Sequence, residues 1–92
     1  MTVGILVIDI MLYESTSLKD KRLVIKSMKD RLKKFNVSIA ELEYQDKWQR
    51  SEIGIAMVGN HQSFVEKSLQ QIFNYLDQSD DYEIINYTFS YV

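Results

Sequence analysis

Two segments with the apolar spacing of amphipathic helices, residues 17–35 and 61–76, each lie between segments with the spacing of β-strands. In the first strand segment aliphatic side chains occur at both parities, which is typical of a central strand covered on at least one side. Four strands are expected at residues 3–13, 37–44, 52–59 and 82–92. The predicted order is therefore strand, helix, strand, strand, helix, strand.

This order consists of two split β-α-β units. With right-handed crossovers they form a ferredoxin-like α+β sandwich, a four-stranded antiparallel sheet with both helices on one face. We expect residues 1–92 to make a single domain of this kind, because 92 residues with 46% hydrophobic content are enough for one core. The first strand would lie centrally and present apolar surface whichever parity faces outward, so we expect a second copy or a partner chain to cover the open face.

The ends and faces of both helices can be predicted from single residues. Ser17 followed by Asp20 resembles a capping box, and Asn36 is the expected end of a helix that reaches Phe35. Asn60 is the expected cap of the second helix, which begins at His61. The first helix is expected to bury Leu18, Val24, Ile25, Met28, Leu32 and Phe35, and the second Val65, Leu69, Ile72 and Leu76.

The first helix is strongly basic. Residues 19–34 hold eight of the eleven Lys and Arg residues and two acids, a net charge of +6, whereas the rest of the chain has a net charge of −8. Five of the cations recur on one face and are expected to form a stripe without acidic partners: Lys19, Arg22, Lys26, Lys29 and Lys33. Such a stripe is either an ordinary solvated surface or a surface for an anionic partner.

Three cations lie in the first turn, where the helix macrodipole disfavours positive charge by about 0.3–1 kcal/mol each. A local rule broken in this way often marks function, and free N–H groups at a helix start bind phosphate readily. We therefore expect a phosphate site, most simply for RNA, formed by Ser15, Ser17, Lys19, Lys21 and Arg22.

Composition excludes several classes of protein. Without cysteine the chain has no disulfide, thiolate metal site or thiol nucleophile. The segment 3–12 is too short to span a bilayer and has no basic region before it, so we expect a cytoplasmic protein that does not enter the membrane. The pI near 5.3 argues against general nucleic-acid affinity and leaves only a local basic patch.

Two aromatic features are candidate partner sites. Trp48 and Arg50 lie in the connection 46–50, where they could stack on a base or anchor a partner. Alternatively, Trp48 folds back over the core and Arg50 pairs with Asp46 or Glu52. In the last strand, core packing or a dimer seam is a simpler explanation than base stacking for the alternating row Tyr87, Phe89 and Tyr91.

Enzymatic activity is not expected. His61 is the only histidine and has no evident metal co-ligand, so we expect neither a metal nor another cofactor. Asp9, Glu41 and Glu43 lie on strands and could converge, but no nucleophile or glycine-rich loop accompanies them. For Asp9, exposure or a salt bridge to a basic neighbour is the simplest explanation.

Several stretches together resemble the YlxP-like family of small uncharacterised bacterial proteins over about residues 1–78. They are Val3-Gly4, Ser17-Leu-Lys-Asp-Lys-Arg22, Phe35-Asn-Val-Ser-Ile-Ala-Glu41, Asp46-Lys-Trp-Gln-Arg50 and Ile53-Gly-Ile-Ala56. The resemblance implies a ferredoxin-like fold and genes that often lie among those for translation initiation and ribosome maturation. It implies no activity.

Two functions remain open. The chain is either a non-enzymatic factor that binds RNA or a ribosomal particle through its basic helix, or a homo-oligomeric interaction module, most simply a homodimer, that uses the open sheet face without nucleic acid.

Overall fold

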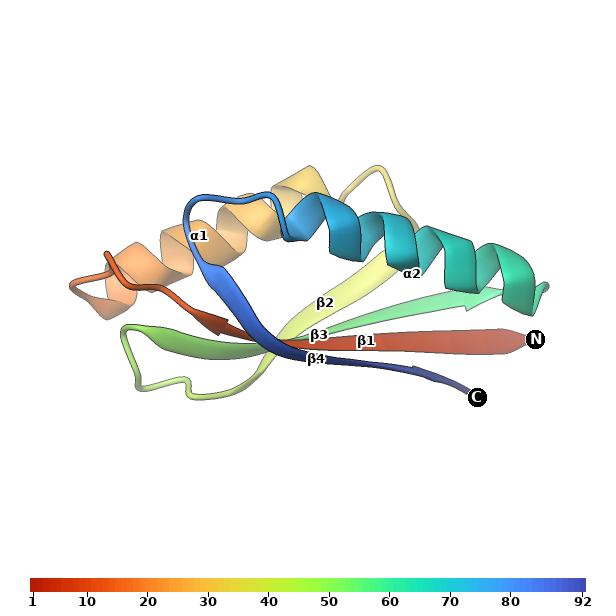
Figure 1. The fold of residues 1–92 in the computed structure, drawn as a ribbon, viewed down its shortest axis with the longest axis horizontal. Coiled ribbons are helices and arrows are strands. Elements are labelled where there is room, and N and C mark those ends of the chain that lie inside the picture. The colour runs from red at the N-terminus through yellow and green to blue at the C-terminus, as the bar shows by residue number, and fades with distance from the viewer.

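The computed structural model describes all of residues 1–92. Its elements follow the predicted order, and both helices lie on the same side of the sheet (Figure 1). They are β1 (Thr2–Met11), α1 (Leu18–Arg31), β2 (Val37–Glu43), β3 (Arg50–Gly59), α2 (Gln62–Leu76) and β4 (Glu83–Tyr91).

All neighbouring strands are antiparallel, in the order β2-β3-β1-β4, so β1 and β3 are central as expected. The predicted ferredoxin-like fold is confirmed. Beyond the regular pairing of β1 with β4, Val3 and Val92 exchange two backbone hydrogen bonds of 3.0 and 2.8 Å. The first and last segments of the sheet are therefore held side by side.

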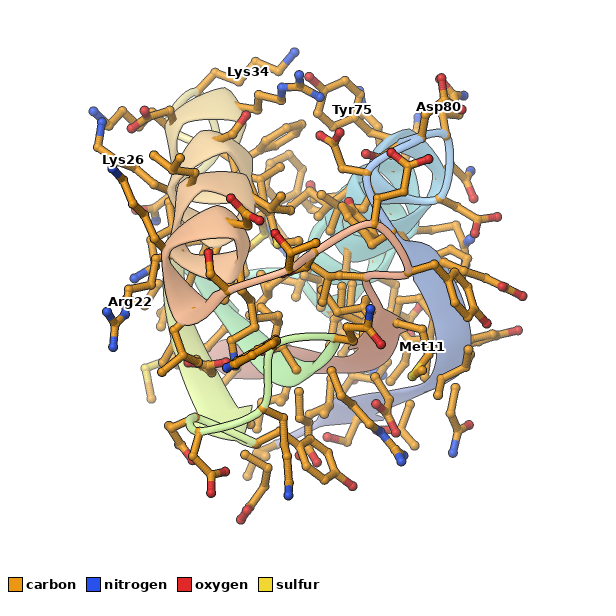
Figure 2. All side chains as sticks on the ribbon, turned by 90° about the vertical axis from the view of Figure 1, so that its left-hand side faces the viewer. Met11, Arg22, Lys26, Lys34, Tyr75 and Asp80 are labelled. Atoms are coloured by element: carbon orange, nitrogen blue, oxygen red, sulfur yellow. The ribbon has the colours of Figure 1, made fainter.

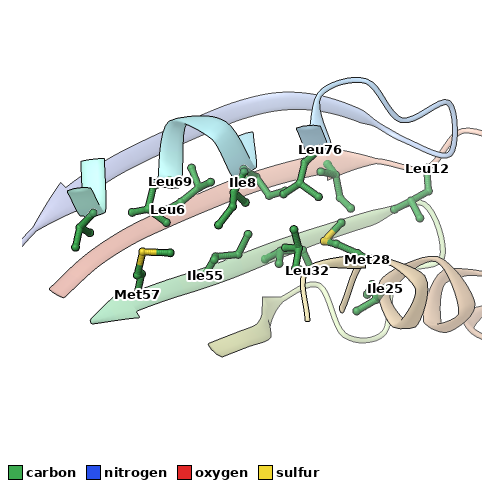
Figure 3. Packing of buried hydrophobic residues seen from close by; sticks show 14 residues of the cluster. Leu6, Ile8, Leu12, Ile25, Met28, Leu32, Ile55, Met57, Leu69 and Leu76 are labelled. Carbon is green, nitrogen blue, oxygen red and sulfur yellow. The ribbon is translucent and has the colours of Figure 1, made fainter. Parts of the chain in front are cut away.

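The core fills the space between the sheet and the helices (Figure 3). In β1 the side chains of Leu6, Ile8 and Ile10 point toward the helices and are fully buried. Ile5 and Val7 point to the opposite face of the sheet, which no helix covers and which we call the bare face, and they are half-buried. Each fully buried aliphatic side chain contributes about 1.5–3 kcal/mol relative to an exposed one. The remaining core residues are Leu12, Ile25, Met28, Leu32, Ile53, Ile55, Met57, Val65, Leu69, Ile72 and Leu76.

Several predicted boundaries differ from the structure, and the cause is clear for three of them. Helix α1 ends at Arg31 rather than Phe35, because the backbone of Leu32 leaves the helical region and the chain continues in turns toward β2. Helix α2 is capped by His61 rather than Asn60, because His61 still has extended dihedral angles. Strand β3 begins at Arg50 rather than Glu52, since Arg50 already pairs with Met11 of β1. The connection between β2 and β3 therefore ends at Gln49 rather than Arg50.

Candidate functional site

The five predicted stripe cations are all solvent-exposed, four on α1 and Lys33 in the turn that follows it. We call them the α1 ridge: Lys19, Arg22, Lys26, Lys29 and Lys33. In Figure 2, Arg22 and Lys26 project from the outer side of α1, away from α2. The ridge presents its charge to solvent along the length of the helix.

The ridge does have an acidic partner, so the expectation of none is wrong. Asp30 lies 3.8 Å from the ammonium of Lys26 and 3.3 Å from that of Lys33. These pairs are exposed, and each contributes at most a few tenths of a kcal/mol. Asp30 reduces the positive charge at the carboxyl-terminal half of the ridge and leaves Lys19 and Arg22 outside its reach.

Two nearby side chains, Ser17 and Asp20, make hydrogen bonds at the amino terminus of α1. Ser17 is the N-cap, and its hydroxyl accepts from the backbone N–H of Asp20 at 3.1 Å, which confirms that half of the capping box. The Asp20 carboxylate accepts from the backbone and the hydroxyl of Thr16 at 3.0 and 2.8 Å. The backbone bond, more than the hydroxyl bond, lowers the pKa of Asp20. A carboxylate therefore stands beside the place where a phosphate was expected.

Ser15 and Lys21 are not available to a ligand at this terminus. Ser15 is buried, and its hydroxyl donates to the carbonyl of Ser17 at 3.1 Å. Lys21 is only 1% exposed and points to the sheet, not to solvent. Of the five residues expected to grip a phosphate, only Lys19 and Arg22 are exposed cations, so the structure does not bring the whole set together.

The Lys21 ammonium joins α1 to the β2–β3 connection. It donates to the carbonyls of Tyr44 at 2.6 Å and Arg50 at 3.3 Å, with a longer contact of 3.5 Å to Gln45. It also lies 2.9 Å from the carboxylate of Glu41. Every hydrogen of the ammonium is therefore engaged by protein oxygens, which is what a buried charge requires.

Ser51 of β3 adds to these contacts by donating to the Glu41 carboxylate at 2.6 Å. We call the set the Lys21 network: Lys21, Glu41, Ser51 and the carbonyls of Tyr44 and Arg50. The sequence contained a signal for it, because Lys21 precedes Ile25, Met28 and Leu32 at the spacing i, i+4, i+7 and i+11 of the buried stripe. A lysine on an apolar stripe indicates either a half-exposed stem or a buried ion pair. The structure has the buried ion pair.

The β2–β3 loop, residues 44–49, is held on several sides. Besides the Lys21 bonds, the Gln49 amide donates to the carbonyls of Tyr13 and Ser15 at 3.0 and 3.1 Å, and the Gln49 carbonyl accepts from Leu12 at 2.8 Å. Tyr44 has a φ of 66°, a left-handed conformation that is uncommon for an aromatic residue. The bond from Lys21 fixes the carbonyl of this residue.

Trp48 projects from this anchored loop. Its side chain is 54% exposed, so it does not fold back over the core. A shallow pocket of about 460 Å³ lies beside it, lined by Met11, Tyr44, Asp46, Lys47, Trp48, Gln49 and Arg50. The pocket combines aromatic and apolar walls with charges of both signs.

Arg50 pairs with Asp9 and not with Asp46 or Glu52. Its guanidinium donates to both carboxylate oxygens of Asp9 at 2.8 and 3.2 Å and lies 4.5 Å from the centre of the Tyr44 ring. The hydrogen bonds to Asp9 are the main reason that the pKa of Arg50 is raised. Of the two explanations left open for Asp9, the structure has the salt bridge to a basic neighbour, and Arg50 is fixed as one wall of the pocket.

The aromatic row of β4 lies on the helix side of the sheet. The Phe73 ring of α2 lies 4.5 Å from the Tyr87 ring and 5.8 Å from the Phe89 ring, centre to centre. Phe89 and Tyr91 pack against the core, while Tyr87 at the edge is half exposed. Core packing therefore accounts for most of this row, and the row takes no part in the bare face.

The strand carboxylates and His61 form no candidate metal site. Asp9 points to the bare face and Glu41 to the helix side, so these two carboxylates lie on opposite faces of the sheet. Glu43 pairs with Glu52, which also pairs with Asp9. No group of three His, Cys, Asp or Glu side chains could hold a metal ion, and His61 is exposed at the start of α2. Neither helix is both long enough and apolar enough to cross a membrane.

The family model described as "Protein of unknown function (DUF503)" matches residues 3–89. The chain belongs to the DUF503 family. It is 40% identical over 82 residues to "Uncharacterized protein YlxP" of Bacillus subtilis (strain 168), which covers 88% of this chain and 89% of that protein. The matched DUF503 region includes the α1 ridge, the Lys21 network and the β2–β3 loop, together with most of β4.

Proposed function

We propose that this protein is a non-enzymatic cytoplasmic factor that binds RNA, free or within a ribosomal particle, through the α1 ridge. The observation that carries the proposal is the exposure of four cations on α1 and a fifth, Lys33, just beyond its end, in a chain that is otherwise acidic. A concentrated positive surface on an acidic protein favours a local contact with a polyanion. The ridge does not depend on Lys21, whose charge is neutralised internally.

The proposal is tested by measuring the affinity for a fluorescent single-stranded RNA of about 16 nucleotides between about 50 and 200 mM salt. Three ridge residues near the start of α1 are replaced together: Lys19→Ala, Arg22→Ala and Lys26→Ala. If each contacts one phosphate, the slope of log affinity against log salt falls by about 2. Co-sedimentation with ribosomal particles should be lost at lower salt than in the wild type.

A matched control separates a local contact from net charge. Three exposed glutamines on α2 can be replaced by glutamate, which lowers the net charge of the protein by three, as the ridge variant does: Gln62→Glu, Gln70→Glu and Gln71→Glu. We expect this control to keep most of the salt slope. Equal losses in the two triple variants, or no RNA binding by the wild type at low salt, would refute binding through the ridge.

A second candidate function is self-association, most simply as a homodimer, through the bare face of the sheet. It is favoured by the aliphatic half of that face, where Val3 pairs with Val58 and Ile5 with Ala56. Val58 is 52% exposed and Leu42 is also exposed. Exposed aliphatic clusters on sheets often mark contacts between proteins.

Sedimentation at high micromolar concentration tests the self-association. Val58→Lys should give a monomer, whereas Ser63→Lys on the opposite layer should leave the assembly unchanged. Association through this face should resist salt and require no RNA. A wild-type protein that is monomeric throughout would exclude the second candidate and leave RNA binding untouched.

A further inference from the structure

We propose that the Trp48 ring stacks against a base of single-stranded RNA, and that the Lys21 network fixes the loop that carries Trp48. This inference rests on the proposed function and specifies it, because it names single strands rather than duplexes as the ligand. An exposed tryptophan accepts any base on its face, and duplex RNA keeps its bases stacked on one another and inaccessible to such a side chain.

The first observation is that the loop backbone is firmly held by hydrogen bonds while its largest apolar side chain, Trp48, remains exposed to solvent. The loop backbone is bound by Lys21 from α1 and by Gln49 toward the β1–α1 connection. Trp48 nevertheless remains 54% exposed. A tryptophan that served the core would bury its ring, so the bonds position the loop while the ring stays free for a ligand.

The second observation is the shape and composition of the pocket beside Trp48. Tyr44 and Met11 supply further apolar surface, and Arg50 is already fixed against Tyr44 and Asp9. A planar group can rest on the Trp48 ring beside the charged lining residues Asp46 and Lys47. Little ordering is needed on binding, which preserves affinity.

The third observation connects this pocket with the α1 ridge. Lys21 lies between Lys19 and Arg22 in the sequence, and its ammonium bonds the Tyr44 carbonyl at 2.6 Å. The first turn of α1 is therefore within one lysine side chain of the loop. A strand whose phosphates contact Lys19 and Arg22 can place a neighbouring base on Trp48. The cations Lys19, Arg22 and Lys47, set against one acid in the pocket wall, Asp46, favour RNA over an apolar protein segment as the occupant.

The experiment uses Trp48 fluorescence, because Trp48 is the only tryptophan of the chain. The full-length protein is titrated with three probes of equal length: oligoadenylate, an abasic ribose-phosphate oligomer and an RNA duplex. Oligoadenylate should quench Trp48 and bind about 5- to 150-fold more tightly than the abasic oligomer. The duplex should leave the emission of Trp48 unchanged.

Anisotropy of labelled oligoadenylate then compares two variants at the same position. Trp48→Ala should lose the preference for oligoadenylate over the abasic oligomer, while Trp48→Phe should retain part of it. Both should keep the salt slope, since the phosphate contacts of the ridge remain. Unfolding in urea confirms that both variants are folded, as expected for a change on an exposed ring.

Two results would overturn the inference while the proposed function stands. In the first, RNA binds but Trp48 is not quenched and Trp48→Ala keeps the base preference. In the second, the duplex and the single strand bind and quench alike. Failure of every probe to bind at low salt would instead refute the proposed function itself. Loss of an RNA-free protein partner in Trp48→Ala would reassign the pocket to a protein anchor.

Discussion

The ammonium of Lys21 on α1 is almost fully removed from solvent and lies 2.9 Å from the carboxylate of Glu41 on β2, whose side chain is 21% exposed. The same ammonium bonds carbonyls at both ends of the β2–β3 loop. One side chain thus connects the start of the first helix, an outer strand and the loop that carries Trp48. Buried pairs of this kind are expensive to break, because the remaining partner stays desolvated.

Replacing Lys21 by Met is expected to lower the free energy of unfolding by about 2–4 kcal/mol, since Glu41 and the loop carbonyls lose their donor. The measurement is equilibrium unfolding in urea. Lys26→Met is the matched control on the same helix, because Lys26 is 76% exposed and should change stability by no more than about 0.5 kcal/mol. Similar values for the two variants would contradict the structural role of Lys21.

Gly4→Ala is expected to destabilise the fold by about 1–3 kcal/mol. A Cβ at Gly4 would meet the side chain of Val65 and would lie 2.7 Å from Leu69, both buried on α2. Gly54→Ala is the control, because its Cβ would lie 2.8 Å from the end of the exposed Leu42 side chain, which can rotate away. Thermal unfolding should show a lower midpoint for Gly4→Ala alone.

The Tyr82 hydroxyl should make stability decrease at alkaline pH. Burial raises the pKa of Tyr82 to about 12, and the hydroxyl donates to the Leu76 carbonyl at 2.9 Å. The folded state therefore keeps a proton that the unfolded state loses near pH 10. This proton contributes fully to the free energy of unfolding below pH 10, and its contribution is lost as pH rises toward 12. We expect a loss of about 1–2 kcal/mol, less than the full pKa shift implies, because the ring is partly exposed.

The comparison for this prediction is Tyr82→Phe, measured by urea unfolding at several pH values. Near neutral pH the variant should be less stable than the wild type by about 1 kcal/mol, the value of the lost hydrogen bond. Above pH 10 the difference should shrink or change sign. A constant difference from pH 8 to pH 11 would show that the Tyr82 proton does not contribute.

Phe73 and Tyr87 are expected to be energetically coupled, because their ring centres are 4.5 Å apart with planes tilted by 50°. A double-mutant cycle of Phe73→Ala and Tyr87→Ala should give a coupling of about 0.5–1.5 kcal/mol. Phe64 is exposed on the same helix, so Phe64→Ala combined with Tyr87→Ala should be additive. A coupling near zero for the first pair would mean that α2 and β4 only lie near each other.

The fold was predictable because the apolar spacing changes with each element. The parity of Leu6, Ile8 and Ile10 and the stripe of Val65 and Leu69 identify buried faces directly, and crossover handedness then leaves one arrangement. Boundaries were less predictable, since the end of α1 at Arg31 depends on the path of the chain into β2. That path is a tertiary constraint without a local signal.

The candidate site was only partly predictable. A charge pattern identifies the cations of a helix but does not say which of them points inward, so Lys21 was grouped with Lys19 and Arg22. Its burial depends on Glu41 and on carbonyls more than twenty residues away. Likewise, Arg50 has acidic neighbours in the sequence but pairs with Asp9, because pairing of β1 with β3 brings the two together.

The central position of β1 has a consequence for how the protein is made. This strand is the first to be synthesised, yet its two neighbours are β3 and β4, and β4 is the last. A nascent chain that lacks β4 leaves one side of its central strand unpaired and the α2 surface around Phe73 uncovered. Complete folding must therefore wait until ribosomal synthesis reaches β4, and such nonlocal pairing is slow and prone to aggregation. Until then the exposed edge of β1 is open to chaperones and to other nascent chains.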